Sequence, residues 1–135
     1  MEEIRSKKGN LVAIIIRADD KSKGVEFYTP SHFSQQVGLL NHKKGAVVRP
    51  HVHKIIKRKV EITQEVLFIK KGKIMLDLYD EAKKHIATRH LKKGDTVILA
   101  SAGHGIKVVE ESLILEVKQG PYAGADDKEY IEGVS

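Results

Sequence analysis

The chain has 135 residues and a formal net charge of +6, from 24 Lys and Arg against 18 Asp and Glu. This length suits one domain with a hydrophobic core of its own, and we predict a single domain over residues 1–135. No apolar run approaches the roughly 18 residues of a membrane span, and residues 1–10 lack the apolar stretch of a signal peptide. Cysteine is absent, which excludes a disulfide framework and thiolate chemistry. We therefore expect a cytoplasmic protein.

The basic residues come in short bursts beside expected turns, at 43–44, 57–59, 70–71, 83–84 and 92–93. Two interpretations are open: solvated turn charge, or attraction of an anionic ligand such as a sugar phosphate or a nucleotide sugar. The lysines are dispersed, only 5% of the residues are aromatic, and no recognition-helix pattern occurs, so a nucleic-acid partner is not expected.

Short β-branched runs alternate with turns rich in Gly, Asn, Asp and Lys, which predicts an all-β sandwich or barrel. We expect strands at 11–17, 25–29, 36–41, 46–53, 61–70, 73–79, 85–91, 96–99, 106–109 and 113–118. Residues 71–72 are expected to form the turn that pairs 73–79 with 61–70. Strand 11–17 is apolar on both faces and needs cover on both, which the rest of the barrel or a partner subunit would supply.

Two histidines, His51 and His53, lie two residues apart in the expected strand 46–53 and therefore share one face. Glu65 shares a face with Leu67 and Ile69 in the next apolar strand. A carboxylate in line with core residues is costly to bury unless it is paired or coordinated. Imidazole and carboxylate groups are ligands for divalent transition metals, so the pattern predicts a metal site.

The other face of that strand carries Val66 and Phe68. Large apolar side chains on an outer face suggest a second layer, which a partner subunit could provide. We therefore expect a homodimer.

The spacing of Gly45, His51, His53, Glu65 and Gly72 resembles the first motif of the cupins, which are small jelly-roll barrels. The gap between the second histidine and the glutamate is longer than in the family, and the basic segment 54–60 accounts for it as an insertion. The resemblance implies a double-stranded β-helix (jelly-roll) barrel. Its core would span about 36–118, with N-terminal strands over 10–29 packing on the barrel or on a partner subunit and a tail over 119–135.

The second cupin motif is matched in part. Gly94 and Asp95, followed by an apolar run, fit its start. The usual Pro and Gly are replaced by Ala100 and Ala102, and Gly105 stands where the family has its last histidine.

His104 precedes that position by one residue. A shift of one residue turns a strand side chain to the opposite face, but the flanking glycines, Gly103 and Gly105, free the backbone there. The resemblance thus implies His104 as a fourth metal ligand. The set of His51, His53 and Glu65 would by itself make a 2-His-1-carboxylate site with open positions.

The ligand set accepts Mn, Fe, Ni, Co or Zn, and does not choose among them. Candidate substrate contacts are basic side chains near the metal ligands and one tyrosine of the tail: Arg49, Lys54, Lys57, Arg58 and Tyr122. Arg49 could instead pair with a buried carboxylate, and packing is the first expectation for the tyrosine. For the remaining histidines, His32, His42, His85 and His90, a structural or solvent-facing role is favoured.

Three functions remain open. The chain's ending resembles small cupins of unassigned role that accompany bacterial surface-sugar synthesis, and a metal site could isomerise or epimerise a small anionic sugar derivative with Glu65 as the proton shuttle. An iron-dependent dioxygenase would use the same ligands, although three Phe, four Tyr and no Trp offer little aromatic lining. A non-enzymatic metal- or ligand-binding domain is the third.

Overall fold

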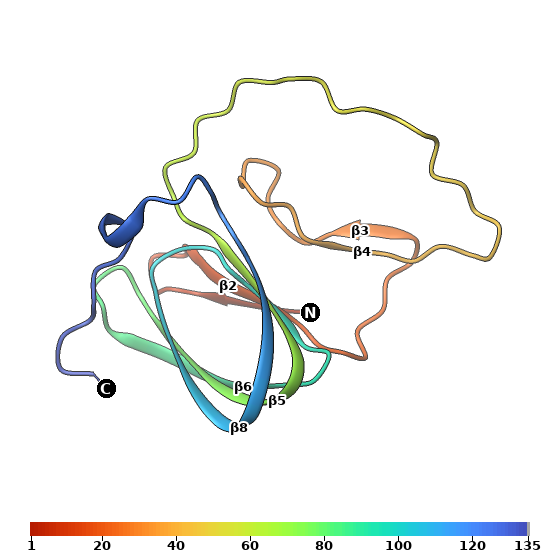
Figure 1. Cartoon of the computed structure of the whole chain (residues 1–135). Helices are drawn as coiled ribbons and strands as arrows, with labels where there is room; N and C mark the ends of the chain where they lie inside the picture. The colour runs from red at the N-terminus through yellow and green to blue at the C-terminus, as the bar shows by residue number, and fades with distance from the viewer. Residues whose placement is uncertain (135) are drawn as a thin grey trace. The chain divides into compact units, whose positions relative to one another are not determined.

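A computed structural model describes residues 1–134 of the chain (Figure 1). These residues form two compact units: residues 1–20 together with 62–134, and residues 21–61. Strands dominate, and the one helical element of the described residues is the short 3-10 turn η1 (Gly124–Asp127). The prediction of an all-β protein is therefore confirmed. Among these residues, no helix has both the length and the apolar character needed to cross a membrane.

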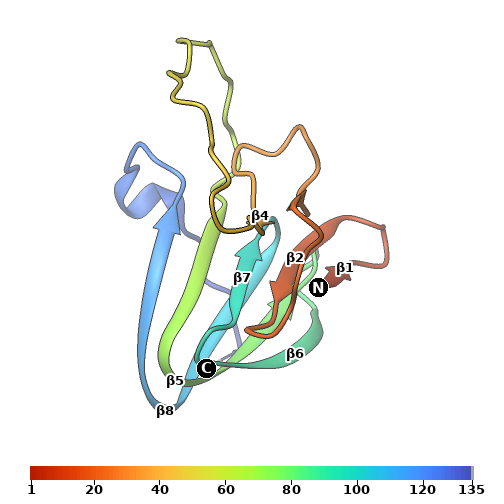
Figure 2. The same cartoon turned by 90° about the vertical axis from the view of Figure 1, so that its right-hand side faces the viewer.

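The first unit is built on one curled, antiparallel sheet with the strand order β1-β2-β7-β5-β6, and β8 lies on the other side of β5. Its strands are β1 (Glu2–Arg5), β2 (Leu11–Ile16), β5 (Glu65–Tyr79), β6 (His85–Lys92), β7 (Thr96–Leu99) and β8 (Gly103–Lys118). Figure 2 shows the sheet curving into a half-barrel.

All six residues of β2 are buried. The strand pairs with β1 on one side and with β7 on the other, which makes it an interior strand of the sheet. The apolar pattern of the sequence did not predict β1, because Glu2–Arg5 is mostly charged and only Ile4 is buried. An edge strand with polar side chains carries a weak apolar signal.

A long two-stranded ribbon, β5 with β8, forms the rest of the wall. It pairs Glu65 with Lys118 at one end and Tyr79 with Gly103 at the other. The predicted hairpin turn at 71–72 is therefore wrong, because 61–70 and 73–79 do not pair with each other but belong to one strand that pairs with β8. The expected break at 110–112 is likewise inside a single strand.

Gly72 and the residues around it bend this ribbon. The register between β5 and β8 shifts three times between Ile69 and Ile74, as β-bulges do where a strand bends. Gly72 has φ 85°, a conformation that residues with a Cβ rarely adopt. A Cβ at this position would lie 2.7 Å from Ser112 Cα and still closer to the carbonyl oxygen of Glu111. The bend thus depends on glycine both for its backbone angle and for its space.

The concave face of the sheet holds the hydrophobic core. In β5 this face alternates through Leu67, Ile69, Ile74, Leu76 and Leu78, all of which are at most 3% exposed. Residues of β2, β6 and β7 complete the cluster, among them Ala13, Ile15, Leu91 and Val97. The predicted inward face of this strand is confirmed, because Glu65, Leu67 and Ile69 are all buried.

Gly94 and Asp95, the pair that resembles the start of the second cupin motif, lie in the turn before β7 and stabilise that turn. Gly94 has φ 90°, and a Cβ there would press on the Ala18 side chain. Asp95 is 1% exposed, and its carboxylate accepts hydrogen bonds from the backbone N–H groups of Ala18 and Lys92 at 2.9 Å. This pair therefore ties the end of β2 to the β6–β7 turn.

The second unit contains a small antiparallel sheet of β3 (Val25–Phe27) and β4 (Gly38–Leu40). These lie within the predicted strands 25–29 and 36–41. The predicted strand 46–53 is wrong, because the chain from 41 to 64 contains no strand. Pro50 stands in the middle of that range and cannot donate a ladder hydrogen bond, and Val47, Val48 and Val52 are exposed.

The close packing around Gly72 can be tested by substitution. We expect Gly72→Ala to lower the free energy of unfolding by more than about 2 kcal/mol, because it adds a steric clash to the cost of about 1–2 kcal/mol for a left-handed residue with a Cβ. Gly9→Ala is the matched control, since Gly9 has φ 87° with open space around its Cβ position. Urea unfolding followed by circular dichroism measures both, and equal losses would contradict the role of close packing at the bend.

A side-chain contact joins β1 and β6, the two strands at opposite ends of the sheet order. Arg89 of β6 donates hydrogen bonds to the Glu2 carboxylate of β1 at 2.8–3.1 Å, although β1 and β6 lie at opposite ends of the sheet. The hydrogen bond from Arg89 lowers the pKa of Glu2 below its ordinary value of 4.5. The curl of the sheet therefore brings its first and last strands together.

A carboxyl group whose pKa is lowered by folding stabilises the fold above its ordinary pKa, and loses that contribution as the pH falls through the lowered value. We expect Glu2→Gln to cost at most about 1 kcal/mol at neutral pH, because the pair is partly exposed. The difference from wild type should vanish in acid. Unfolding free energies of the variant and of the exposed control Glu132→Gln across pH check this, and a difference that persists in acid would contradict it.

Candidate functional site

Glu65 and His104 meet on the concave face of the first unit. The Nε2 atom of His104 lies 3.3 Å from Oε2 of Glu65, and the two side chains are 33% and 11% exposed. Glu65 begins β5, whereas His104 lies near the start of β8 and pairs with Leu78 at the far end of β5. The ends of the ribbon are therefore folded onto each other. This gives the buried carboxylate the partner that its position among core residues requires.

These two donors have the spacing that a shared metal ion needs. Two ligand atoms about 2.1 Å from an ion and at right angles to each other lie about 3 Å apart. The distance of 3.3 Å between Glu65 and His104 fits such a pair. Within residues 1–134, no group of three or more His, Cys, Asp or Glu side chains is gathered as a metal site.

Lys118 is the cationic neighbour of this pair. Its Nζ atom lies 3.9 Å from Oε1 of Glu65 and 3.0 Å from Oδ2 of Asp127. Thr63 donates a hydrogen bond to the other oxygen of Asp127, and this bond together with Lys118 lowers the pKa of that carboxyl. The bond to Asp127, reinforced by the charges of Asp127 and Glu65, raises the pKa of Lys118. The ammonium group is thus held beside Glu65 in its charged form.

His104 reaches this position from a tight corner after β7. Ala102 has φ 60°, a left-handed angle that is costly for a residue with a Cβ. Gly103 approaches the Tyr79 and Ile131 side chains so closely that a Cβ would lie 2.8–3.1 Å from them. The corner therefore fixes how β8 begins, and with it the direction of the histidine.

His51 and His53 belong to the second unit, where they form a pair of their own. Their ring centroids are 5.2 Å apart with an interplanar angle of 73°. Nδ1 of His51 lies 2.7 Å from the carbonyl oxygen of Arg49. Both histidines are exposed and lie outside regular structure. The four predicted ligands thus occur as two pairs, one in each unit, and the two members of each pair lie close to each other.

The candidate substrate contacts are all exposed. Arg49, Lys54, Lys57 and Arg58 belong to the irregular segment of the second unit. Tyr122 follows β8 in the first unit and is 88% exposed, so the expectation that it packs is wrong. Its neighbours in sequence, two Gly and a Pro, already predicted a turn.

Two residues of the site were missed by sequence reasoning. Lys118 was placed only at the end of a strand, and Asp127 only in the tail. The alternation of β8 would have put Lys118 on the same face as Glu116 and Ile114, but its register against Glu65 depends on the bulges at the bend. Comparison with known proteins gave no match to a family model, to a curated protein or to a solved structure.

Proposed function

We propose that this chain is a metal-binding protein of the cupin type, with a jelly-roll fold and a cytoplasmic location, that acts on a small anionic metabolite. A divalent transition ion (Mn, Fe, Ni, Co or Zn) would be held by Glu65, His104, His51 and His53. The metabolite would be a sugar phosphate or a nucleotide sugar, and the reaction an isomerisation or epimerisation.

One observation carries the proposal. The Glu65 carboxylate and the His104 imidazole come from opposite ends of a long ribbon and approach to 3.3 Å. Carboxylate and imidazole together are the donor types that Mn, Fe, Co, Ni and Zn accept. The pair is anchored on strands rather than on loops, which suits a site that must hold its geometry.

A bound ion would polarise a carbonyl or hydroxyl group of the metabolite. Glu65 is the proton acceptor that the chain itself supplies, through Oε1 or Oε2. Lys118, held by Asp127 at 3.0 Å, is placed to attract the negative charge of the metabolite. The basic side chains Lys54, Lys57 and Arg58 would add to that attraction from the segment that carries the two other histidines.

The metal proposal predicts that purified protein binds about one divalent transition ion per chain. We expect His51→Ala/His53→Ala, Glu65→Gln and His104→Ala each to weaken metal binding by more than about tenfold, because even changes to outer-shell partners of a metal site typically cost about 10- to 100-fold. Elemental analysis after dialysis against each of Mn, Fe, Co, Ni and Zn measures the metal content.

The double variant His32→Ala/His42→Ala is the matched control, because it also removes two histidines of the second unit. Wild-type metal content that equals that of the His51→Ala/His53→Ala variant would show that these histidines bind no ion, and the proposal would fail. A thermal-shift screen of metal-loaded protein against sugar phosphates and nucleotide sugars then tests the substrate class.

The convex face of the ribbon supports the homodimer that the sequence predicts. Val66 pairs with Val117 and Phe68 with Leu115 across β5 and β8, so these side chains share one face. Phe68 is 37% exposed, and Leu113, Leu115 and Val117 are each more than half exposed. We infer that a second copy of the chain covers this convex stripe, since large exposed apolar patches mark interaction surfaces.

We expect Phe68→Asp/Leu115→Asp to convert a dimer to a monomer, because two buried charges without partners would oppose association. Light scattering coupled to size-exclusion chromatography measures the mass. Val108→Asp is the control, since Val108 is exposed on the same strand but on its concave face. The convex stripe would not be the dimer interface if wild type were a monomer, or if Val108→Asp dissociated the dimer and Phe68→Asp/Leu115→Asp did not.

A further inference from the structure

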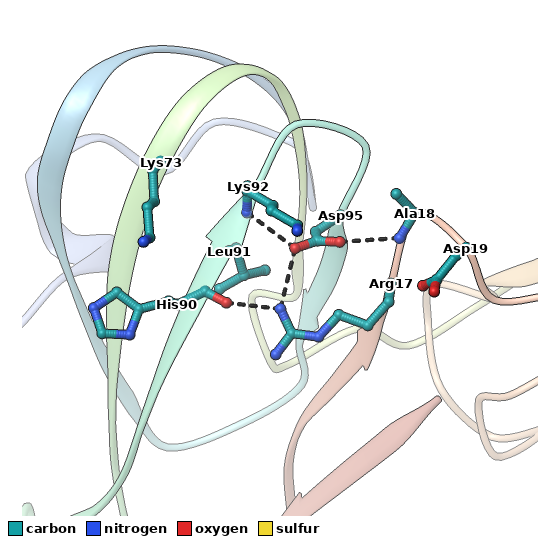
Figure 3. Close-up of a pocket in the computed structure, with 8 residues that line it drawn as sticks. All are labelled: Arg17, Ala18, Asp19, Lys73, His90, Leu91, Lys92 and Asp95. Atoms are coloured by element: carbon teal, nitrogen blue, oxygen red, sulfur yellow. Dashed lines mark hydrogen bonds and ion pairs between the residues drawn. The ribbon is translucent and has the colours of Figure 1, made fainter.

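A cavity separate from the Glu65–His104 pair lies on the first unit, at the turn between β6 and β7. It is a cavity of about 590 Å³, which is in the range of small-molecule sites. Its lining residues are Arg17, Ala18, Asp19, Lys73, His90, Leu91, Lys92 and Asp95 (Figure 3). None of the predicted metal ligands or substrate contacts belongs to this set.

The pairing of β5 with β6 brings basic side chains together in the cavity. Lys73 of β5 and Lys92 of β6 are direct cross-strand partners, so both side chains emerge on one face. His90, two residues before Lys92, shares that face. Like charges directly opposite each other destabilise an antiparallel pair. Neither ammonium group forms an ion pair with a carboxylate of residues 1–134, so an anion between them would relieve their repulsion.

Arg17 brings a third cation and is fixed in place. Its Nη1 atom donates to the carbonyl oxygen of His90 at 2.7 Å and to Oδ2 of Asp95 at 3.1 Å. These contacts are drawn in Figure 3. In the described part of the chain, Nε and Nη2 of Arg17 have no hydrogen-bond partner. A guanidinium held in this way keeps two donors in a fixed direction for an incoming anion.

The carboxylates near the cavity offset this positive charge in part. Asp95 is buried and already accepts hydrogen bonds from Ala18, Lys92 and Arg17. Asp19 lines the cavity but is exposed to solvent. Glu110 of β8 is opposite Lys73 in the register, on the side away from Lys92. The residues that line the cavity therefore carry three cationic side chains, Arg17, Lys73 and Lys92, against two carboxylates, Asp19 and Asp95.

We propose that this cavity binds the phosphate group of a small phosphate monoester, or inorganic phosphate itself. Arg17 would offer its two free donors, and Lys73 and Lys92 would contribute charge from opposite strands, with His90 as a further N–H donor. Guanidinium and ammonium groups together are suited to a phosphate dianion, which accepts several charge-assisted hydrogen bonds at once. The site is distinct from the Glu65–His104 pair and needs no metal.

The test is isothermal titration calorimetry of metal-free protein with inorganic phosphate and, in a parallel arm, with glucose 6-phosphate, at constant ionic strength. We expect Lys73→Gln/Lys92→Gln to weaken binding by about tenfold or more, since each lysine supplies a charge-assisted hydrogen bond. Lys84→Gln, which changes an exposed lysine at the far end of the β5–β6 ribbon, should bind as wild type does. Tighter binding of glucose 6-phosphate identifies a monoester site, and equal binding identifies a site for phosphate alone.

A thermal readout keeps folding apart from binding. Without phosphate, Lys92→Gln should melt about 1–5 °C higher than wild type, because a like-charge pair is removed. Phosphate should raise the melting temperature of wild type and of Glu65→Gln/His104→Ala, but not that of Lys73→Gln/Lys92→Gln. Absence of phosphate binding in wild type, or equal binding by the double lysine variant, would overturn the proposal, and neither result depends on the metal site.

Discussion

The bend of the β5–β8 ribbon at Gly72 is the constraint on which the first unit depends. A straight ribbon would carry Leu78, the register partner of His104, about 40 Å away from Glu65 at about 3.3 Å a residue. The bent ribbon instead leaves His104 3.3 Å from Glu65. The left-handed backbone of Gly72 and its close approach to Glu111 and Ser112 make this fold-back possible. Core burial along Leu67, Ile69 and Ile74 then holds the two halves of the strand against the same interior.

The same ribbon organises charge on its two faces. The concave face places Glu65 beside His104 and Lys118, where each charge has a partner. On the convex face of the neighbouring β5–β6 pair, Lys73 and Lys92 lie opposite each other, and neither forms an ion pair within residues 1–134. This contrast between the two places is why they suggest two ligands.

The sequence predicted the fold class and the strand faces well, because alternation of apolar side chains reports directly on burial. Leu11–Ile16 and Thr96–Leu99 lie where they were expected, and Val66 and Phe68 face away from the core. It failed where a local signal has two meanings. Lys71-Gly72 has the composition of a hairpin turn, yet long-range pairing with β8 makes it a bend. Around His51 and His53, apolar residues suggested a strand, but Pro50 interrupts the ladder that a strand would need.

The spacing of residues in the sequence did not decide whether His104 would lie on the same face as Glu65. The one-residue displacement of His104 argued for the wrong face, and only the corner at Ala102 and Gly103 decides its direction. Lys118 and Asp127 were missed for a related reason, since the approach of Lys118 to Glu65 depends on the bulged register, and Asp127 reaches Lys118 from the turn η1. Such positions are set by tertiary packing and carry no periodic signal.

The most direct test of this account follows the imidazole signals of the seven histidines by NMR while Mn²⁺ is added to one equivalent. Paramagnetic Mn²⁺ broadens only nuclei close to it, and the histidines are spread over both units. We expect the signals of His104, His51 and His53 to broaden most strongly and together, while those of His32, His42, His85 and His90 broaden less. Persistence of the His104 signal at one equivalent, or uniform broadening of all seven, would contradict a metal site centred on Glu65 and His104.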